Sequence, residues 1–221
     1  MKTIITLTRY PEIFNRLRAS VDLYEPEARK MVIVSGGARV WAPGWEVVLG
    51  VEPFIFARNA NIGLNRVHGD VLLMNDDCEL ISPVLEIMGS ICEKNLNIGI
   101  LSPQIEGAVG GNSLQKVHKS DLEYEISKKR LAFPCVYIPH RTLQTVGTID
   151  ERFSGYGFDD DDYCYRVQQN GLDLGVTGMV IVRHGLDGKM SSSFLRKMNK
   201  WEWYWSLGKM WVEYKKKQIG L

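Results

Sequence analysis

Residues 71–80 read Val-Leu-Leu-Met-Asn-Asp-Asp-Cys-Glu-Leu, a stretch in which two carboxylates follow an apolar run and one asparagine. Its four leading apolar residues are typical of a buried strand, which cannot hold two adjacent carboxylates in its interior. Asp76 and Asp77 are therefore expected just beyond the strand's carboxyl end. In an open α/β sheet that end binds ligands, and carboxylate oxygens are ligands that Mg²⁺ and Mn²⁺ prefer. Taken alone, the stretch also fits a strand followed by a polar turn.

A second acidic cluster strengthens the interpretation as a binding site. Residues 159–162 are four consecutive aspartates between glycines and aromatics, and helical spacing continues from there to Asn170-Gly171, a helix stop. Carboxylates at a helix start complement the helix dipole. Four in a row exceed that need, because adjacent like charges repel unless a cation or a proton is shared. The two clusters together predict one shared metal and substrate site.

Bulk composition describes an ordinary globular chain. The 221 residues are 45% hydrophobic and 24% charged, with a net charge of +1, which excludes a generally basic protein that coats nucleic acid. The four cysteines are widely separated and are expected to be free thiols. The apolar start of the chain is too short for a signal peptide, and no stretch is long enough for a membrane span. We therefore expect a cytoplasmic protein without a transmembrane segment.

Strands alternate with helices along the chain. Strand patterns at 2–8, 31–34, 70–74, 98–101, 133–138 and 174–182 flank helical patterns at 11–23 and 142–146. Short strands are expected at 45–49 and 53–57, a helix at 62–67, and a helix capped by Ser82 with Pro83 in its first turn. This order predicts the α/β class, with a mainly parallel twisted sheet and helices on both faces. Residues 195–217 predict an aromatic and basic helix, for which packing on the domain is favoured over a membrane surface or nucleic acid.

Three motifs in one order resemble family 2 glycosyltransferases of the GT-A fold. They are Phe56-Ala57-Arg58-Asn59-Ala60-Asn61-Ile62-Gly63-Leu64-Asn65, then Met74-Asn75-Asp76-Asp77, then Gly147-Thr148-Ile149-Asp150-Glu151-Arg152-Phe153 leading into residues 159–163 and Arg166. The resemblance covers residues 3 to about 187. It implies one GT-A catalytic domain at 1–187, with 188–221 as a C-terminal loop and an aromatic, basic helix that packs on the same domain.

The resemblance also implies a donor site. Asn75-Asp76-Asp77 occupies the place of the family's Asp-x-Asp motif, so Asp77 is expected to bind Mn²⁺ or Mg²⁺ together with His184, at the end of a late strand. The residues expected to contact the nucleotide sugar are Thr8, Arg9, Ser35, Arg58, Asn75 and Asp76. Arginine suits a diphosphate because it makes bidentate, charge-assisted contacts.

The family's acceptor side resembles the second acidic cluster. Asp160 takes the place of the general base of inverting enzymes, and a carboxylate within reach of an acceptor hydroxyl can accept its proton. Asp159 and Tyr156 are expected to bind the acceptor. Asp162 and Arg166 are expected to form a structural ion pair, because they lie four residues apart on the helix.

The resemblance thus implies a metal-dependent inverting glycosyltransferase that moves a sugar from a nucleotide-diphosphate sugar to an acceptor hydroxyl. The acceptor stays open among a glycan, a lipid-linked glycan and a modified nucleic acid. One alternative is a glycosyltransferase that acts on hydroxylated DNA bases, gripping DNA with the Trp- and Lys-rich tail. Nucleotidyl transfer is another, although residues 8–11 lack the glycine-rich phosphate loop that it needs. A third is a non-catalytic metal- or sugar-binding module, although 159–170 lacks the ligand spacing of an EF-hand.

Overall fold

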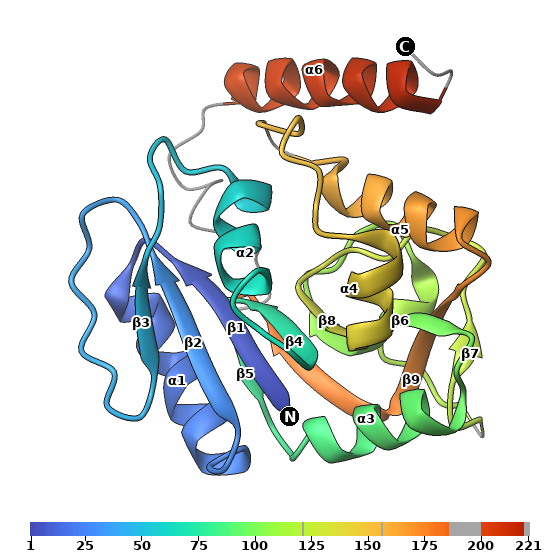
Figure 1. Ribbon diagram of the computed structural model, residues 1–221, viewed down its shortest axis with the longest axis horizontal. Helices are drawn as coiled ribbons and strands as arrows, with labels where there is room; N and C mark the ends of the chain where they lie inside the picture. The colour runs from blue at the N-terminus through green and yellow to red at the C-terminus, as the bar shows by residue number, and fades with distance from the viewer. Residues whose placement is uncertain (121, 156, 186–199, 219–221) are drawn as a thin grey trace.

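The computed structural model describes residues 1–120, 122–155, 157–185 and 200–218, which form a nine-stranded sheet with helices around it (Figure 1). The strands are β1 (Lys2–Thr8), β2 (Arg29–Val34), β3 (Glu46–Leu49), β4 (Asp70–Asn75), β5 (Cys78–Leu80), β6 (Ile98–Gly107), β7 (Glu125–Ile126), β8 (Cys135–Ile138) and β9 (Asp173–His184). The helices are α1 (Pro11–Tyr24), α2 (Phe56–Leu64), α3 (Leu85–Lys94), α4 (His140–Val146), α5 (Asp159–Gln169) and α6 (Lys200–Gln218), with a 3-10 turn η1 at Ser113–Gln115.

The strands follow the order β3-β2-β1-β4-β8-β6-β9-β5, and β7 pairs with β9 outside that path. The four strands from β3 to β4 run parallel, as do β6 and β9. Strand β8 is antiparallel to β4 and β6, and β5 is antiparallel to β9. The parallel block brings the carboxyl ends of β1, β2 and β4 to one edge of the sheet (Figure 1). The α/β class and the single sheet agree with the sequence prediction.

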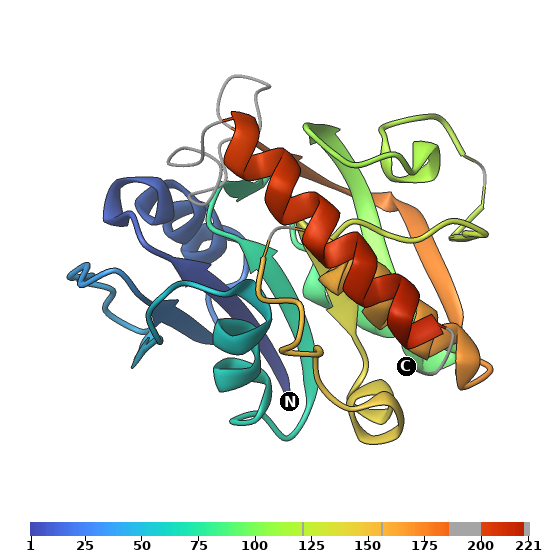
Figure 2. The ribbon, with the colours of Figure 1, turned by 90° about the horizontal axis from the view of Figure 1, so that it is seen from above.

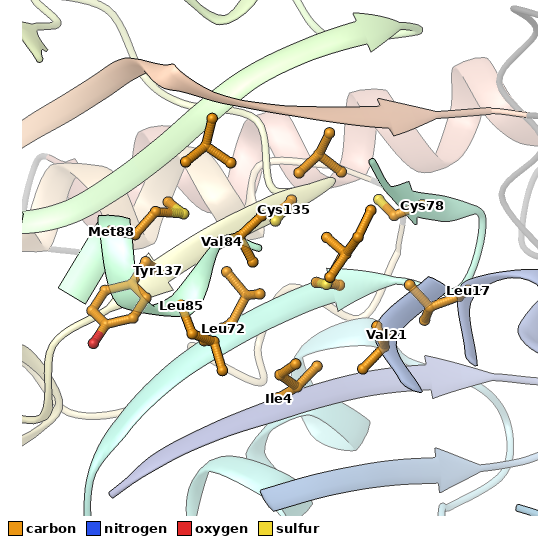
Figure 3. Packing of buried hydrophobic residues seen from close by; sticks show 14 of the residues in the cluster. Ile4, Leu17, Val21, Leu72, Cys78, Val84, Leu85, Met88, Cys135 and Tyr137 are labelled. Carbon is orange, nitrogen blue, oxygen red and sulfur yellow. The ribbon is translucent and has the colours of Figure 1, made fainter. Parts of the chain in front are cut away.

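Two hydrophobic clusters, one on each face of the sheet, hold the helices in place. Ile4 and Leu72 belong to the cluster that α1 and α3 cover, which Figure 3 shows from close by. Ile5 and Leu73, the next residue in each strand, belong to the cluster that α2 and α5 cover. Successive side chains of a strand point to opposite faces, so these runs of apolar residues fill both clusters at once. Helices on both faces are therefore confirmed.

One predicted stretch is wrong in its secondary structure. A single helix, α2, spans Phe56–Leu64 in place of the strand expected at 53–57 and the helix expected at 62–67. Ala57, Ala60 and Leu64 recur at helical spacing and are buried against the sheet. Asn59 also ties the helix to the preceding loop, because its side-chain oxygen accepts the Val51 N–H at 2.9 Å. This packing overrides the strand-like composition of 53–57.

The capping prediction for α3 is also wrong. The helix begins at Leu85, beyond Ser82 and Pro83, and its cap comes from another element. The Glu25 carboxylate, just after α1, accepts the N–H groups of Val84 and Leu85 at 2.6 and 2.9 Å. A carboxylate at this end satisfies free donors and complements the helix dipole. The cap also joins α1 to α3 on one face of the sheet.

Two smaller expectations are confirmed. All four cysteines are free thiols and are buried. Asp162 and Arg166 form the expected ion pair within α5, with Nε of Arg166 2.8 Å from the carboxylate. Within the described ranges, no helix has both the length and the apolar character needed to cross a membrane.

Candidate active site

The carboxyl-end edge of the sheet opens into a cavity of about 350 Å³. Its walls come from the ends of β1, β4 and β9, from the loops before α2 and β8, from the start of α5 and from α6. The lining residues are Leu7, Phe54, Phe56, Asn75, Asp76, Ala108, Val109, Gly110, Ala132, Phe133, Pro134, Gly155, Gly157, Phe158, Asp159, Asp160, Asp161, His184 and Leu207. Both acidic clusters predicted from the sequence therefore contribute to one cavity.

Asp77 and His184 form a buried polar pair in this region. Asp77 lies in the turn between β4 and β5, and the antiparallel pairing of β5 with β9 brings His184 beside it. Its Oδ1 atom is 3.1 Å from Nε2 of His184, and both side chains are buried. His184 lines the cavity, and Asp77 contacts His184 without lining the cavity itself.

The hydrogen bonding of His184 shows that this pair fits a cation. Its Nδ1 faces the Ala108 carbonyl, which can only accept, so Nδ1 carries a proton. In the neutral ring Nε2 is then an acceptor, and it faces the Asp77 carboxylate, which is another acceptor. Burial disfavours the imidazolium, but the hydrogen bond and charge of Asp77 outweigh it and raise the pKa of His184. The Asn75 amide nitrogen also lies 3.4 Å from Nε2. A second ring proton or a bound cation between Nε2 and the Asp77 carboxylate would make their contact favourable, and a carboxylate and an imidazole both suit Mn²⁺.

Cys78 also lies within ligand distance of this pair, but its chemistry does not suit Mn²⁺ or Mg²⁺. Its thiol donates a hydrogen bond to the Pro134 carbonyl at 3.0 Å. Burial, with the neighbouring Cys135 and Asp77 adding to it, raises the pKa of the Cys78 thiol well above its ordinary value. A thiol that stays protonated is a poor metal ligand, so Asp77 and His184 are the better pair.

Thr8 and Asp76 meet across neighbouring parallel strands. The register of β1 and β4 places Leu7 opposite Asn75, so the residues that follow are adjacent too. The Thr8 hydroxyl donates to the Asp76 carboxylate at 2.8 Å and accepts the Tyr10 N–H at 3.1 Å. The Asp76 carboxylate is thus held at the cavity wall by the end of β1.

The start of α5 presents its aspartates to the cavity in a constrained conformation. Phe158, which precedes the helix, has a left-handed φ of 68°, sparsely populated by residues other than glycine. Burial raises the pKa of Asp159 to about 6 and raises that of Asp160 well above its ordinary value, with Asp161 adding to both shifts by its charge. A raised pKa makes a carboxylate a stronger base near neutral pH.

Helix α6 lies across this region (Figure 2), and its side chains contact both the cavity and α5. Leu207 lines the cavity, and the Gly155 N–H points at the buried sulfur of Met210 at 3.1 Å. The ring of Tyr214 stacks on Phe158 with centroids 5.6 Å apart. These contacts place the C-terminal helix against the residues that precede the Asp159–Asp162 run.

Lys217, near the end of α6, fastens the helix to two carboxylates. Its Nζ is 2.6 Å from Asp162, which is fully buried, and 2.8 Å from Asp150. Burial opposes ionisation of Asp150, but hydrogen bonds from Arg152 and Lys217 outweigh it and hold its pKa well below the usual range. A cation from α6 therefore balances part of the negative charge beneath the acidic cluster.

Replacing Lys217 with methionine should lower the free energy of unfolding by about 1–3 kcal/mol, because a buried oxygen of Asp162 loses its cation. Urea denaturation of the full chain measures this change. Lys216→Met is the matched control. Lys216 is exposed, its one ion pair among the described residues is with Glu213 at 3.3 Å, and its replacement should change stability by less than about 0.5 kcal/mol. Equal effects of the two substitutions would mean that Lys217 does not hold the helix.

The remaining residues expected at the donor site lie outside the cavity lining. Arg9 is 3.5 Å from Glu52 and lies over the ring of Phe54, which does line the cavity. Ser35 is buried after β2, where its N–H donates to the Thr8 carbonyl at 3.0 Å. Arg58 projects from α2, about half exposed, and pairs with Glu151 at 3.6 Å. Tyr156, expected at the acceptor site, lies outside the described residues.

Several cavity residues were not anticipated as site residues. Most are apolar or aromatic side chains from loops, from the start of α2 and from α6, including Phe54, Phe56, Phe133 and Leu207. Asp161 also reaches the cavity, and its pKa is raised by burial. Only Asp161 had a visible signal, because it belongs to the aspartate run. The apolar residues carry no motif, and only the folded chain brings them together.

Comparison with known proteins extends the description of the fold. No protein-family model and no curated protein matches the sequence. The crystal structure of GalNAc-T7 with UDP, GalNAc and Mn²⁺ superposes with a TM-score of 0.70 at 14% identity, covering 98% of this chain and 49% of that one. Two structures of S. aureus TarS give TM-scores of 0.61 and 0.63, both at 12% identity, covering 83% and 96% of this chain and 60% and 39% of theirs. The chain thus spans at most 60% of the length of these proteins. Identities this low show the fold alone, and the fold is GT-A.

Proposed function

We propose that the protein is a metal-dependent inverting glycosyltransferase, which moves a sugar from a nucleotide-diphosphate sugar to an acceptor hydroxyl. The observation that carries the proposal is the meeting of two acidic clusters around one cavity. In the first cluster Asp77 pairs with His184, and the pair is suited to a cation. In the second cluster Asp159 and Asp160 have raised pKa values. The fold likeness to a structure that contains UDP and Mn²⁺ is consistent with the proposal.

On the donor side, Asp77 and His184 would hold Mn²⁺ or Mg²⁺. When bound, such a cation neutralises the charge that develops on the departing diphosphate. Asn75 and Asp76 line the cavity beside the pair, and their side chains can hydrogen-bond ribose hydroxyls. Thr8 keeps the Asp76 carboxylate in place. Arg9 lies over the ring of Phe54, a cavity residue, so we assign it to the edge of the donor site.

On the acceptor side, Asp160 is proposed as the general base. The acceptor oxygen forms a bond to the anomeric carbon, while the bond from that carbon to the diphosphate oxygen breaks. The hydroxyl proton passes to the Asp160 carboxylate, and the nucleoside diphosphate leaves with the bonding electrons. Attack opposite the leaving group inverts the anomeric configuration. Asp159 lines the same wall and is proposed to bind the acceptor.

Donor hydrolysis tests the proposal without knowledge of the acceptor. The protein is incubated with Mn²⁺ and a panel of UDP-, GDP- and dTDP-sugars, and released nucleoside diphosphate and sugar are measured. A glycosyltransferase is expected to hydrolyse one donor slowly, and an α-linked donor should first release the β-sugar. Initial release of the α-sugar would overturn inversion. Pyrophosphate release from a nucleoside triphosphate and a sugar phosphate would indicate nucleotidyl transfer, and Ca²⁺ binding with no response to any nucleotide would indicate a binding module.

A further inference from the structure

The two sides of α6 differ in character over its described residues. Ser206, Met210, Tyr214 and Lys217 recur at helical spacing and face the domain, where Met210 is fully buried. The exposed positions from 205 to 216 define the outer face of α6. They are Trp205, Gly208, Lys209, Trp211, Val212, Lys215 and Lys216. The helix therefore holds the domain with one side and presents a distinct surface with the other.

Large apolar side chains are unusually exposed on this outer face. Trp205 is 72% exposed, Trp211 50% and Val212 43%. Packing among the described residues does not explain two exposed tryptophans on one side of a helix, because the opposite side makes the contacts with the domain. Exposed aromatic surface of this kind marks a site of interaction.

The charges of the outer face are all positive. Lysines alternate with the tryptophans, with Nζ of Lys209 5.9 Å from the ring centre of Trp205 and Nζ of Lys215 5.8 Å from that of Trp211. The exposed positions of the described part of α6 include no carboxylate. Glu213, at the border of the face, balances only Lys216. The surface thus combines aromatic rings with excess positive charge in a protein whose overall net charge is +1.

The position of α6 suits contact with a flat surface. Helix α6 forms an outer layer of the molecule in Figure 1, and in Figure 2 it crosses the front of the molecule diagonally. A helix in this position can lay its full outer face on a flat surface while the domain stays beneath it. Tryptophan and lysine are suited to such a boundary, because each has an apolar body and a polar end.

We propose that the outer face of α6 docks the protein onto an anionic lipid bilayer. The tryptophan rings enter the headgroup region, and Lys209, Lys215 and Lys216 remain at its surface, where they attract acidic phospholipids. Proteins that bind single-stranded nucleic acid usually place their aromatic rings in a basic groove. The outer face of α6 is convex, so a bilayer fits it better. The proposal is independent of the proposed transfer reaction.

Vesicle sedimentation with the full chain tests the proposal. The protein is expected to sediment with phosphatidylcholine vesicles that contain phosphatidylserine and to stay in solution with phosphatidylcholine alone, and added salt should release it. Removing two lysines together, K209Q/K215Q, should weaken binding roughly thirtyfold, which corresponds to ~2 kcal/mol. Removing two rings together, W205A/W211A, should weaken it at least about tenfold.

Matched variants elsewhere control for lost charge and lost apolar surface. K128Q/K129Q removes two exposed lysines from the segment before β8, and W41A/L49A removes two side chains more than 80% exposed near the sheet edge. Both should bind vesicles like the unaltered protein, and circular dichroism checks that all four variants fold. Absence of binding to acidic vesicles, or equal losses in test and control variants, would overturn the proposal. So would tighter binding to single-stranded DNA than to vesicles, or a dimer that W205A/W211A dissociates, because the face would then serve nucleic acid or a second copy.

Discussion

Replacing Asp160 with asparagine is expected to lower the transfer rate roughly a hundredfold to ten-thousandfold, the usual contribution of a general base. Asp160 lies in the first turn of α5 and lines the cavity, and its Oδ1 accepts the Asp161 N–H at 2.9 Å. An amide keeps this acceptor and the side-chain volume but cannot take up a proton near neutral pH. Binding of the nucleoside diphosphate with Mn²⁺, measured by calorimetry, should therefore change by less than about twofold while turnover falls.

The pH profile and a neighbouring variant make this test specific. Burial raises the pKa of Asp160, and a base must be ionised to act. The rate of the unaltered protein should therefore fall with decreasing pH at values above the ordinary aspartate range. Asp161→Asn removes a carboxylate from the same helical turn and the same cavity wall, and it should keep most of the activity. Collapse of donor binding in Asp160→Asn would instead make Asp160 a ligand of the donor or the metal.

Replacing Asp77 with alanine is expected to abolish the dependence of donor binding on Mn²⁺. The carboxylate faces Nε2 of His184 at 3.1 Å, and without it the site retains one of its two strongest candidate ligands. Loss of a partner in a metal site commonly weakens binding by about 10–100-fold, and loss of a direct ligand should cost at least that much. Titration of the preferred nucleoside diphosphate, with and without Mn²⁺, measures the difference.

Asp173→Ala is the matched control for this variant. Asp173 begins β9 and His184 ends it, so the control removes a carboxylate from the far end of the same strand. It should leave the response to Mn²⁺ unchanged. Thermal unfolding of both variants shows whether the fold survives the loss of a buried partner of His184. A folded Asp77→Ala protein with the original Mn²⁺ response would place the cation elsewhere.

Runs of apolar residues identified most of the strands, and the positions of the carboxylates identified the two acidic clusters. Both signals are local in the sequence. Residues 71–77 predict a buried strand followed by charged residues. In the structure β4 ends at Asn75, and Asp76 and Asp77 follow it. The prediction failed at α2 because residues 53–57 have the composition of a strand. The helix forms there because Ala57 and Ala60 pack on the sheet. The start of α3 depends on Glu25, almost sixty residues earlier, which no inspection of nearby caps could find.

The sequence predicted the charged residues of the candidate site but not its apolar residues. Carboxylates after strands and at helix starts stand out by position, so Asp76 and Asp160 could be named. The ring of Phe133 and the side chain of Leu207 reach the cavity only through tertiary packing. The role of Arg58 at the donor stays a prediction, and its half-exposed side chain pairs with Glu151 in this structure.

The double role of α6 has a thermodynamic consequence. Leu207 lines the cavity and Trp205 faces outward, with a single residue between them on one continuous helix. A ligand that contacts Leu207 and changes the position of α6 would also change the position of Trp205, and the two sites would then be energetically coupled. If a ligand in the cavity changes the affinity for the partner of Trp205 by some factor, that partner must change the affinity for the cavity ligand by the same factor. Docking of the outer face of α6 and binding of a ligand in the cavity would then each strengthen or weaken the other by the same factor.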